Sequence, residues 1–209
     1  MHQCINAARQ IAGIASIIIC AGLVIGVLNQ TGLGIKVTSV ILNLAGGQLW
    51  LALLLTALAC LILGMEVPTT AAYVICVSVA GPALQELGMA PLHAHLFVFW
   101  YALLSTITPP VCGTVFIAAG MAQTSWVPVA GQAMRLGLGL YIVPLAFVAN
   151  TALLYPGDNL LLALAAFAKV AVGLWLMSRG LIGGQIAFWQ RPLLFILGLG
   201  GIFAFGISA

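Results

Sequence analysis

Residues 63–73 read LGMEVPTTAAY, and this short stretch decides how the chain around it can fold. The sequence on both sides is apolar, but Gly64 and Pro68 interrupt it here. Proline has no backbone N–H, and its ring clashes with the preceding turn of a helix. The stretch therefore separates two apolar helices, 49–63 and 71–84, which either span a membrane twice or enter it as a re-entrant hairpin.

The composition of the whole chain places these helices in a membrane. Of its 209 residues, 64% are hydrophobic and only 4% are charged, and the mean hydropathy is +1.24. A soluble domain has about 25% charged residues, and disordered chains are poor in apolar residues. The apolar runs are continuous, whereas barrel strands alternate polar and apolar residues. We predict an all-α polytopic membrane protein with about six or seven membrane segments.

The same composition argues against several classes of partner and site. The six Lys and Arg residues are spread along the chain and form no basic patch, so we expect no nucleic-acid partner. The five cysteines include no C-x-x-C pair, and most of them lie in apolar runs. Cysteine behaves there as a small hydrophobic residue, so neither a disulfide framework nor a zinc site is expected.

A second interruption lies at the centre of the apolar run 96–119, where residues 105–110 read STITPP. Two consecutive prolines remove two donors and leave carbonyl groups unbonded one turn earlier. Both interruptions carry hydroxyl side chains, namely Thr69, Thr70, Ser105, Thr106 and Thr108. Unbonded carbonyls and hydroxyls suit a hard cation such as sodium, and the N-termini of half-helices favour an anionic solute. Discontinuous helices of this kind recur in secondary transporters.

Glu66 lies within the first interruption. An ionisable residue at membrane depth is by default a candidate functional residue, here a cation ligand or a protonatable relay. The alternative is a structural one, in which Glu66 lies in a wet cavity at the hairpin tip or pairs with Arg135. The sequence leaves both interpretations open.

Further apolar runs and the charges between them suggest an orientation. With Arg9 in the cytoplasm, Arg135, Arg179 and Arg191 fall on the same side, and Lys36 is the exception to the positive-inside rule. This rule is sufficient to explain Arg135, although an anionic substrate would also suit it. The expected spans are 11–28, 135–154 with a kink at Pro144, 160–177 and 192–207, with a connection at 124–128.

Residues 63–73 closely resemble the L-G-M-G-x-P-T-T-A-A-Y signature of TRAP transporter fused permeases, the tripartite ATP-independent periplasmic transporters of the TAXI-associated type. Residues 95–99 (HLFVF) and 104–111 (LSTITPPV) resemble the A-H-L-F-V-F and L-S-x-I-T-P-P-V motifs of the same family. Glu66 departs from the pattern, because the family has a small glycine there. The resemblance covers roughly residues 5–155 and implies a second-repeat membrane domain over 1–155. The apolar runs that follow predict two additional transmembrane helices over 156–209.

The resemblance implies one repeat of an elevator-type permease in the large membrane subunit. Its re-entrant hairpin would be 49–84 with a tip at 64–70, and its broken helix 96–119 would cross at 105–110. Such permeases lie in the bacterial inner membrane and take up an anionic organic solute, usually with sodium, after delivery by a periplasmic solute-binding protein. No cofactor is expected beyond sodium as coupling ion. The implied substrate and cation site comprises Gly64, Glu66, Pro68, Thr69, Thr70, Ser105, Thr106, Thr108, Pro109 and Pro110.

Two alternatives remain. Full fused permeases are longer, so the permease interpretation requires a partner chain that supplies the first repeat. The first alternative is that the chain is a non-transporting fragment or assembly subunit. The other alternative is an intramembrane enzyme that uses Glu66 with His93 or His95. The sequence contains neither a G-x-S-G nucleophile nor an H-E-x-x-H pair, and the two histidines are two residues apart, whereas a metal pair on one helix face needs a spacing of three or four. We therefore predict that the protein is not an enzyme.

Overall fold

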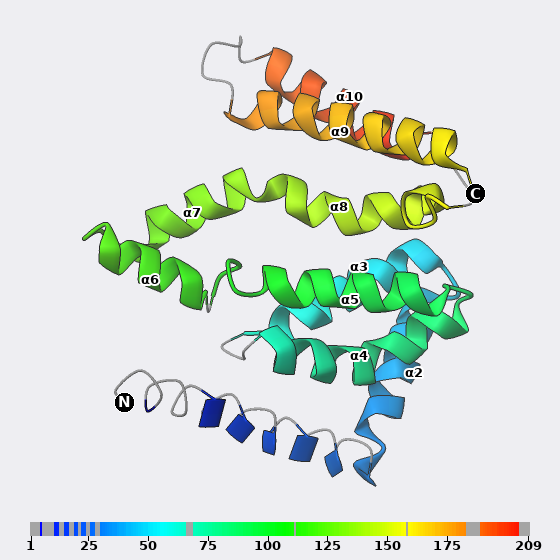
Figure 1. The fold of residues 1–209 in the computed structure, drawn as a ribbon, viewed down its shortest axis with the longest axis vertical. Coiled ribbons are helices and arrows are strands. Elements are labelled where there is room, and N and C mark those ends of the chain that lie inside the picture. The colour runs from blue at the N-terminus through cyan, green and yellow to red at the C-terminus, as the bar shows by residue number, and fades with distance from the viewer. Residues whose placement is uncertain are drawn as a thin grey trace. The chain divides into compact units, whose positions relative to one another are not determined.

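The computed structural model describes residues 5, 11–12, 15–16, 19–20, 22–23, 26–27, 30–65, 69–110, 112–157, 159–182 and 189–204. Across these residues the chain forms helices, turns and bends and contains no strand, which confirms the predicted all-α class (Figure 1). Glu66 and Pro68, and most of the span expected over 11–28, lie outside the described residues. Helix contacts divide the chain into two compact units, residues 1–106 with 110–112, and residues 107–109 with 113–209.

The first unit packs four helices against one another: α2 (Leu33–Ala45), α3 (Leu49–Leu63), α4 (Thr69–Glu86) and α5 (Pro91–Leu104). Gly46 and Gly47 separate α2 from α3, with φ of 55° and 78°. These values lie in the left-handed region, which glycine adopts without a steric penalty. Pro91 at the start of α5 fits a first helical turn, which needs no N–H donor.

The interior of the first unit is made mostly of small side chains. Alanines and cysteines of α3 and α4 fill it: Ala52, Ala57, Cys60, Ala71, Ala72, Cys76, Ala80 and Ala83. Large apolar residues of α3, such as Leu54, Leu58 and Ile62, are instead more than half exposed. Small residues let helix backbones approach closely where lipid, and not water, surrounds the protein. This arrangement of small residues inside and large apolar residues outside fits helices that face lipid.

The second unit contains α6 (Gly113–Met121), α7 (Trp126–Leu136), α8 (Leu138–Ala149), the short 3-10 helix η1 (Thr151–Leu153), α9 (Leu160–Ile182) and α10 (Gln190–Phe203). Two stretches, Trp126–Ala149 and Leu160–Leu181, are long and apolar enough to cross a membrane, judged by length and composition alone. The connection predicted over 124–128 is confirmed at residues 124–125 but not at 126–128, because α7 begins at Trp126. Ser125 is extended, and Pro128 lies in the first turn, where a helix tolerates proline.

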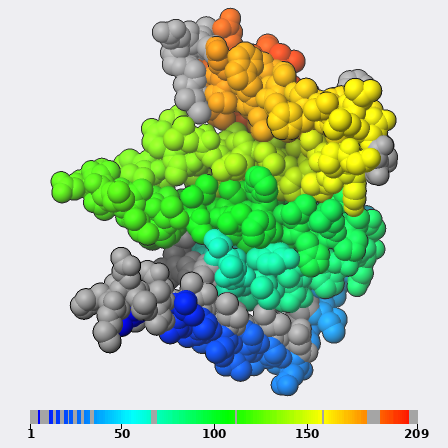
Figure 2. Space-filling view, in the orientation of Figure 1, coloured from blue at the N-terminus to red at the C-terminus, as the bar shows by residue number. Residues whose placement is uncertain are grey.

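Helices α9 and α10 form a closely packed hairpin whose contact depends on glycines (Figures 1 and 2). A Cβ atom on Gly198 would lie 2.6 Å from the carbonyl oxygen of Gly173, and one on Gly180 would lie 2.8 Å from that of Arg191. Both distances are shorter than a real Cβ contact, so larger residues would force the two helices apart.

Candidate functional site

The first interruption separates α3 from α4. The N–H of Gly64 donates to the carbonyl oxygen of Cys60 at 2.9 Å and closes the last turn of α3, and α4 begins at Thr69. Gly64 is buried, Thr69 is half-buried and Thr70 is exposed. The other two predicted site residues of this interruption, Glu66 and Pro68, lie outside the described residues.

The second interruption lies where the sequence places its two prolines. Helix α5 ends at Leu104 and α6 begins at Gly113, so the apolar run 96–119 is broken near its centre. The Thr106 hydroxyl donates to the carbonyl oxygen of Leu103 at 2.8 Å, and it satisfies one of the acceptors left at the end of α5. Pro109 is half-buried and Pro110 is exposed.

The two interruptions meet at a buried contact between Gly64 and Ser105. The Ser105 hydroxyl lies 3.0 Å from the carbonyl oxygen of Gly64 and 2.7 Å from that of Ala102, so its proton can be donated to either. A Cβ atom on Gly64 would lie 2.5 Å from Ser105 Oγ and 2.9 Å from its Cβ. A residue with a Cβ atom at position 64 would therefore require Ser105 to move. Residues 41 positions apart in the sequence are thus held together, one from each predicted half of the site.

Thr108 belongs to the second unit and contacts a residue outside the predicted set. Its Oγ1 lies 2.6 Å from the Tyr141 Oη, and either hydroxyl can donate. Tyr141 is half-buried in α8, in the otherwise apolar sequence LGLYIVPLAF. A phenol within an apolar helix needs a hydrogen-bond partner when it is buried, which is the sequence signal that marks this residue.

The two histidines of the enzyme alternative have different surroundings. His93 is buried near the start of α5, and His95 is exposed, with its Nδ1 2.8 Å from the Tyr73 Oη. Within the described part of the chain, no three His, Cys, Asp or Glu side chains are grouped in a way that could hold a metal ion. Glu66 lies outside the described residues, so the structure gives no distance between Glu66 and either histidine.

A polar network centred on Asn150 links three helices of the second unit. The side chain of Asn150 is fully buried, and its Nδ2 donates to the carbonyl oxygens of Ala146 at 2.9 Å and Ile202 at 3.3 Å. Its Oδ1 accepts a hydrogen bond of 3.0 Å from Lys169 Nζ. Neither Asn150 nor Lys169 is among the predicted site residues. The signal for Lys169 is a single cation near the middle of the 23-residue apolar helix α9.

Comparison with known families accounts for most of the chain. A family model described as "Tripartite ATP-independent periplasmic transporter, DctM component" matches residues 1–157. The matched region contains both interruptions and ends before α9. Comparisons with curated proteins and with solved structures give no significant match. The chain therefore belongs to the DctM family, the large membrane permease component of tripartite ATP-independent periplasmic transporters.

Proposed function

We propose that this permease component couples the uptake of an anionic organic solute to sodium, and that the two interruptions provide the cation site and part of the solute site. The observation that carries the proposal is the buried contact between Gly64 and Ser105. Helix ends at membrane depth are tolerated only where protein or a water-filled cavity covers them. A contact that joins two such ends is what a shared binding site requires.

The chemistry around this contact supports a cation together with an anion. Thr69 and Thr70 open α4, and both carry oxygen ligands of the kind that a hard cation prefers. The N-terminal end of α4 carries partial positive charge, which favours a carboxylate on the solute. Glu66, three residues before Thr69 in the sequence, is proposed as a further cation ligand or a proton relay.

The family gives the setting for this chemistry. A permease of the tripartite class is a membrane transporter component. We further propose the TAXI-associated fused type, a bacterial inner-membrane location, an elevator-type movement of the hairpin 49–84, and delivery of the solute by a periplasmic binding protein. A first repeat, with a hairpin of its own, would complete the site.

Sodium binding to the full chain tests the proposal. In lipid nanodiscs, sodium should raise the melting temperature relative to an equal concentration of choline, because a ligand that binds only the folded state stabilises it. Thr69→Ala should abolish this difference. Thr124→Ala is the matched control, because Thr124 is exposed in the turn between α6 and α7 and lies outside both interruptions.

Three results test the proposed cation site and its coupling to uptake. Sodium stabilisation that is lost in Thr69→Ala and kept in Thr124→Ala supports the site. Equal stabilisation by sodium and choline would contradict the cation site. In cells that carry the complete transporter, solute uptake that is unchanged when choline replaces sodium would contradict the coupling.

A further inference from the structure

A groove at one end of the α9–α10 hairpin combines two arginines with apolar side chains. It lies within the second unit and has a volume of about 430 Å3. Arg135 comes from the last turn of α7, Leu181 from the end of α9, and Arg191 from the start of α10. Phe195 and Ile196 follow Arg191 one turn further along α10. We call this site the arginine groove.

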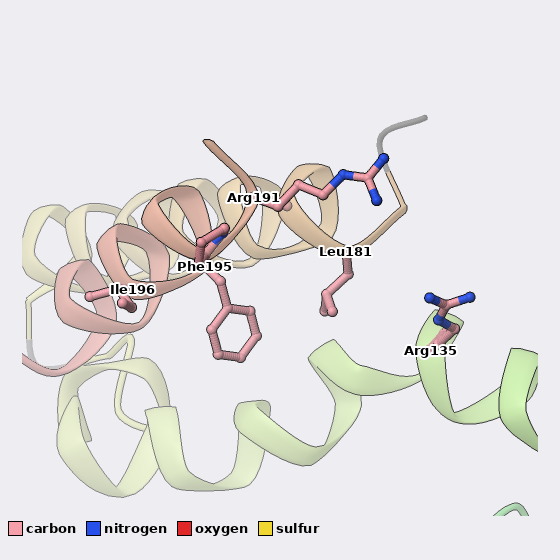
Figure 3. A pocket seen from close by; sticks show the side chains of 7 residues that line it. Arg135, Leu181, Arg191, Phe195 and Ile196 are labelled. Atoms are coloured by element: carbon pink, nitrogen blue, oxygen red, sulfur yellow. The ribbon is translucent and has the colours of Figure 1, made fainter. Parts of the chain in front are cut away.

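The arginine groove is amphipathic along its length. In Figure 3 the guanidinium groups of Arg135 and Arg191 lie towards one side, and Phe195 and Ile196 lie towards the other. The Phe195 ring points from α10 towards the ribbon of the preceding helices. A ligand that fits both ends carries negative charge at one end and an apolar chain at the other.

The groove has a marked excess of positive charge. None of its lining residues is acidic. Between residues 113 and 209 the sequence contains a single acidic residue, Asp158. Asp158 lies outside the described residues; in the sequence it comes two residues before α9, whereas Leu181 lies near the other end of that helix. An anion from outside the chain would therefore meet no competing carboxylate of the lining.

The position of the groove fits a membrane surface. Helix α9 has 23 residues and is long enough to cross the hydrocarbon region, so its last turn reaches an interface. A second cavity beside the groove is lined by Leu138 and Gly139 of α8 together with Leu174 and Met177 of α9, so α8 begins at the same level at which α9 ends.

An arginine and two tryptophans near the end of α9 and the start of α10 also indicate a membrane interface at the groove. Arg179 lies in the last turn of α9, with its guanidinium carbon 4.8 Å from the centre of the Trp175 ring. Trp175 and Trp189 are both more than half exposed. Exposed tryptophans are typical of the membrane interface, and clustered arginines are typical of its cytoplasmic side.

We propose that the arginine groove binds the phosphate of an anionic phospholipid, with an acyl chain along Phe195 and Ile196. Guanidinium groups bind phosphate oxygens through paired, charge-assisted hydrogen bonds. Free inorganic phosphate offers the same oxygens, but it would leave the apolar half of the groove unused. Basic pockets between membrane helices on the cytoplasmic side are suited to anionic headgroups.

Lipid binding to the full chain in detergent, measured by native mass spectrometry, tests the proposal. We expect one phosphatidylglycerol to be retained in preference to phosphatidylcholine, and we expect millimolar inorganic phosphate not to displace it. Each arginine near an anionic headgroup contributes about fivefold in affinity, so the double variant Arg135→Gln/Arg191→Gln should weaken phosphatidylglycerol binding about 25-fold.

Arg179→Gln is the matched control. It removes the same charge from the same end of the second unit but does not line the groove, so it should change binding by less than about twofold. The double variant Arg135→Lys/Arg191→Lys keeps the charge, and it should bind phosphatidylglycerol more tightly than the glutamine pair if both fold.

Three outcomes would overturn the proposal. Equal retention of phosphatidylglycerol and phosphatidylcholine would show that the groove does not distinguish lipids by the charge of their headgroups. An equal loss in Arg179→Gln would assign the effect to the general positive charge of this surface. Displacement of the lipid by inorganic phosphate that depends on Arg135 and Arg191 would assign the groove to the free anion.

Discussion

Substitution of Gly64 by alanine should separate the two interruptions of the chain. The new Cβ would lie 2.5 Å from Ser105 Oγ, 2.9 Å from Ser105 Cβ and 3.0 Å from the carbonyl oxygen of Cys60, whereas ordinary contacts are 3.4–4 Å. Ser105 must therefore move away from Gly64. Such overpacking costs about 1–3 kcal/mol. Loss of the hydrogen bond from Ser105 to Gly64 adds about 1 kcal/mol, so we expect Gly64→Ala to lower the free energy of unfolding by about 2–4 kcal/mol.

The assay is reversible unfolding in mixed micelles, with a double-mutant cycle. Ser105→Gly removes both atoms of Ser105 that the new methyl group would meet. Gly64→Ala/Ser105→Gly should therefore recover the packing part of the loss. Gly120→Ala is the matched control, because Gly120 lies in α6 with open space around the added Cβ. It should stabilise the protein by up to about 1 kcal/mol, through helix propensity alone.

The cycle gives a clear refutation. If Gly64→Ala lowers the free energy of unfolding no more than Gly120→Ala does, the two interruptions are not in contact. The same conclusion follows if adding Ser105→Gly to Gly64→Ala restores none of the lost free energy. Sodium-dependent stabilisation measured on the same variants links the contact to function. We expect Gly64→Ala to lose this stabilisation and Gly120→Ala to keep it.

Two further predictions concern polar contacts of the second unit. Tyr141→Phe should lower the free energy of unfolding by about 0.5–1.5 kcal/mol, and Thr108→Val should add little to it in the double variant, because both remove the same hydrogen bond; additive losses would contradict the contact. Asn150→Leu removes the hydrogen bonds to Ile202 and Lys169, which average about 0.6 kcal/mol each in membrane proteins, and leaves the Lys169 ammonium without this acceptor. We therefore expect Asn150→Leu to lower the free energy of unfolding in micelles by about 1–3 kcal/mol, and Lys169→Met to reverse part of this loss. If Lys169→Met leaves the loss unchanged, the ammonium is not coupled to Asn150.

Features that depend on local chemistry could be predicted from the sequence. The ends of α3 and α5 are examples, because Gly64, Pro68 and the Pro109–Pro110 pair act on the backbone within one turn of their own position. Motifs around both interruptions also indicated the permease family that the comparison confirms. The start of α7 is the counterexample. The predicted connection ran to Pro128, yet Trp126, Val127 and Pro128 form the first turn of an amphipathic helix, Trp126–Leu136.

The sequence by itself determined that this protein is a helical membrane protein and where its helices are interrupted. Composition decides the solvent that a chain can face, and proline and glycine act locally, so neither result depends on the rest of the fold. Only the tertiary structure decided that Ser105 meets Gly64, that Asn150 joins α8 to α9 and α10, and that Arg135 and Arg191 share a groove. Each of these contacts joins residues far apart in the sequence, because side chains of neighbouring helices meet only where close backbone packing brings them together.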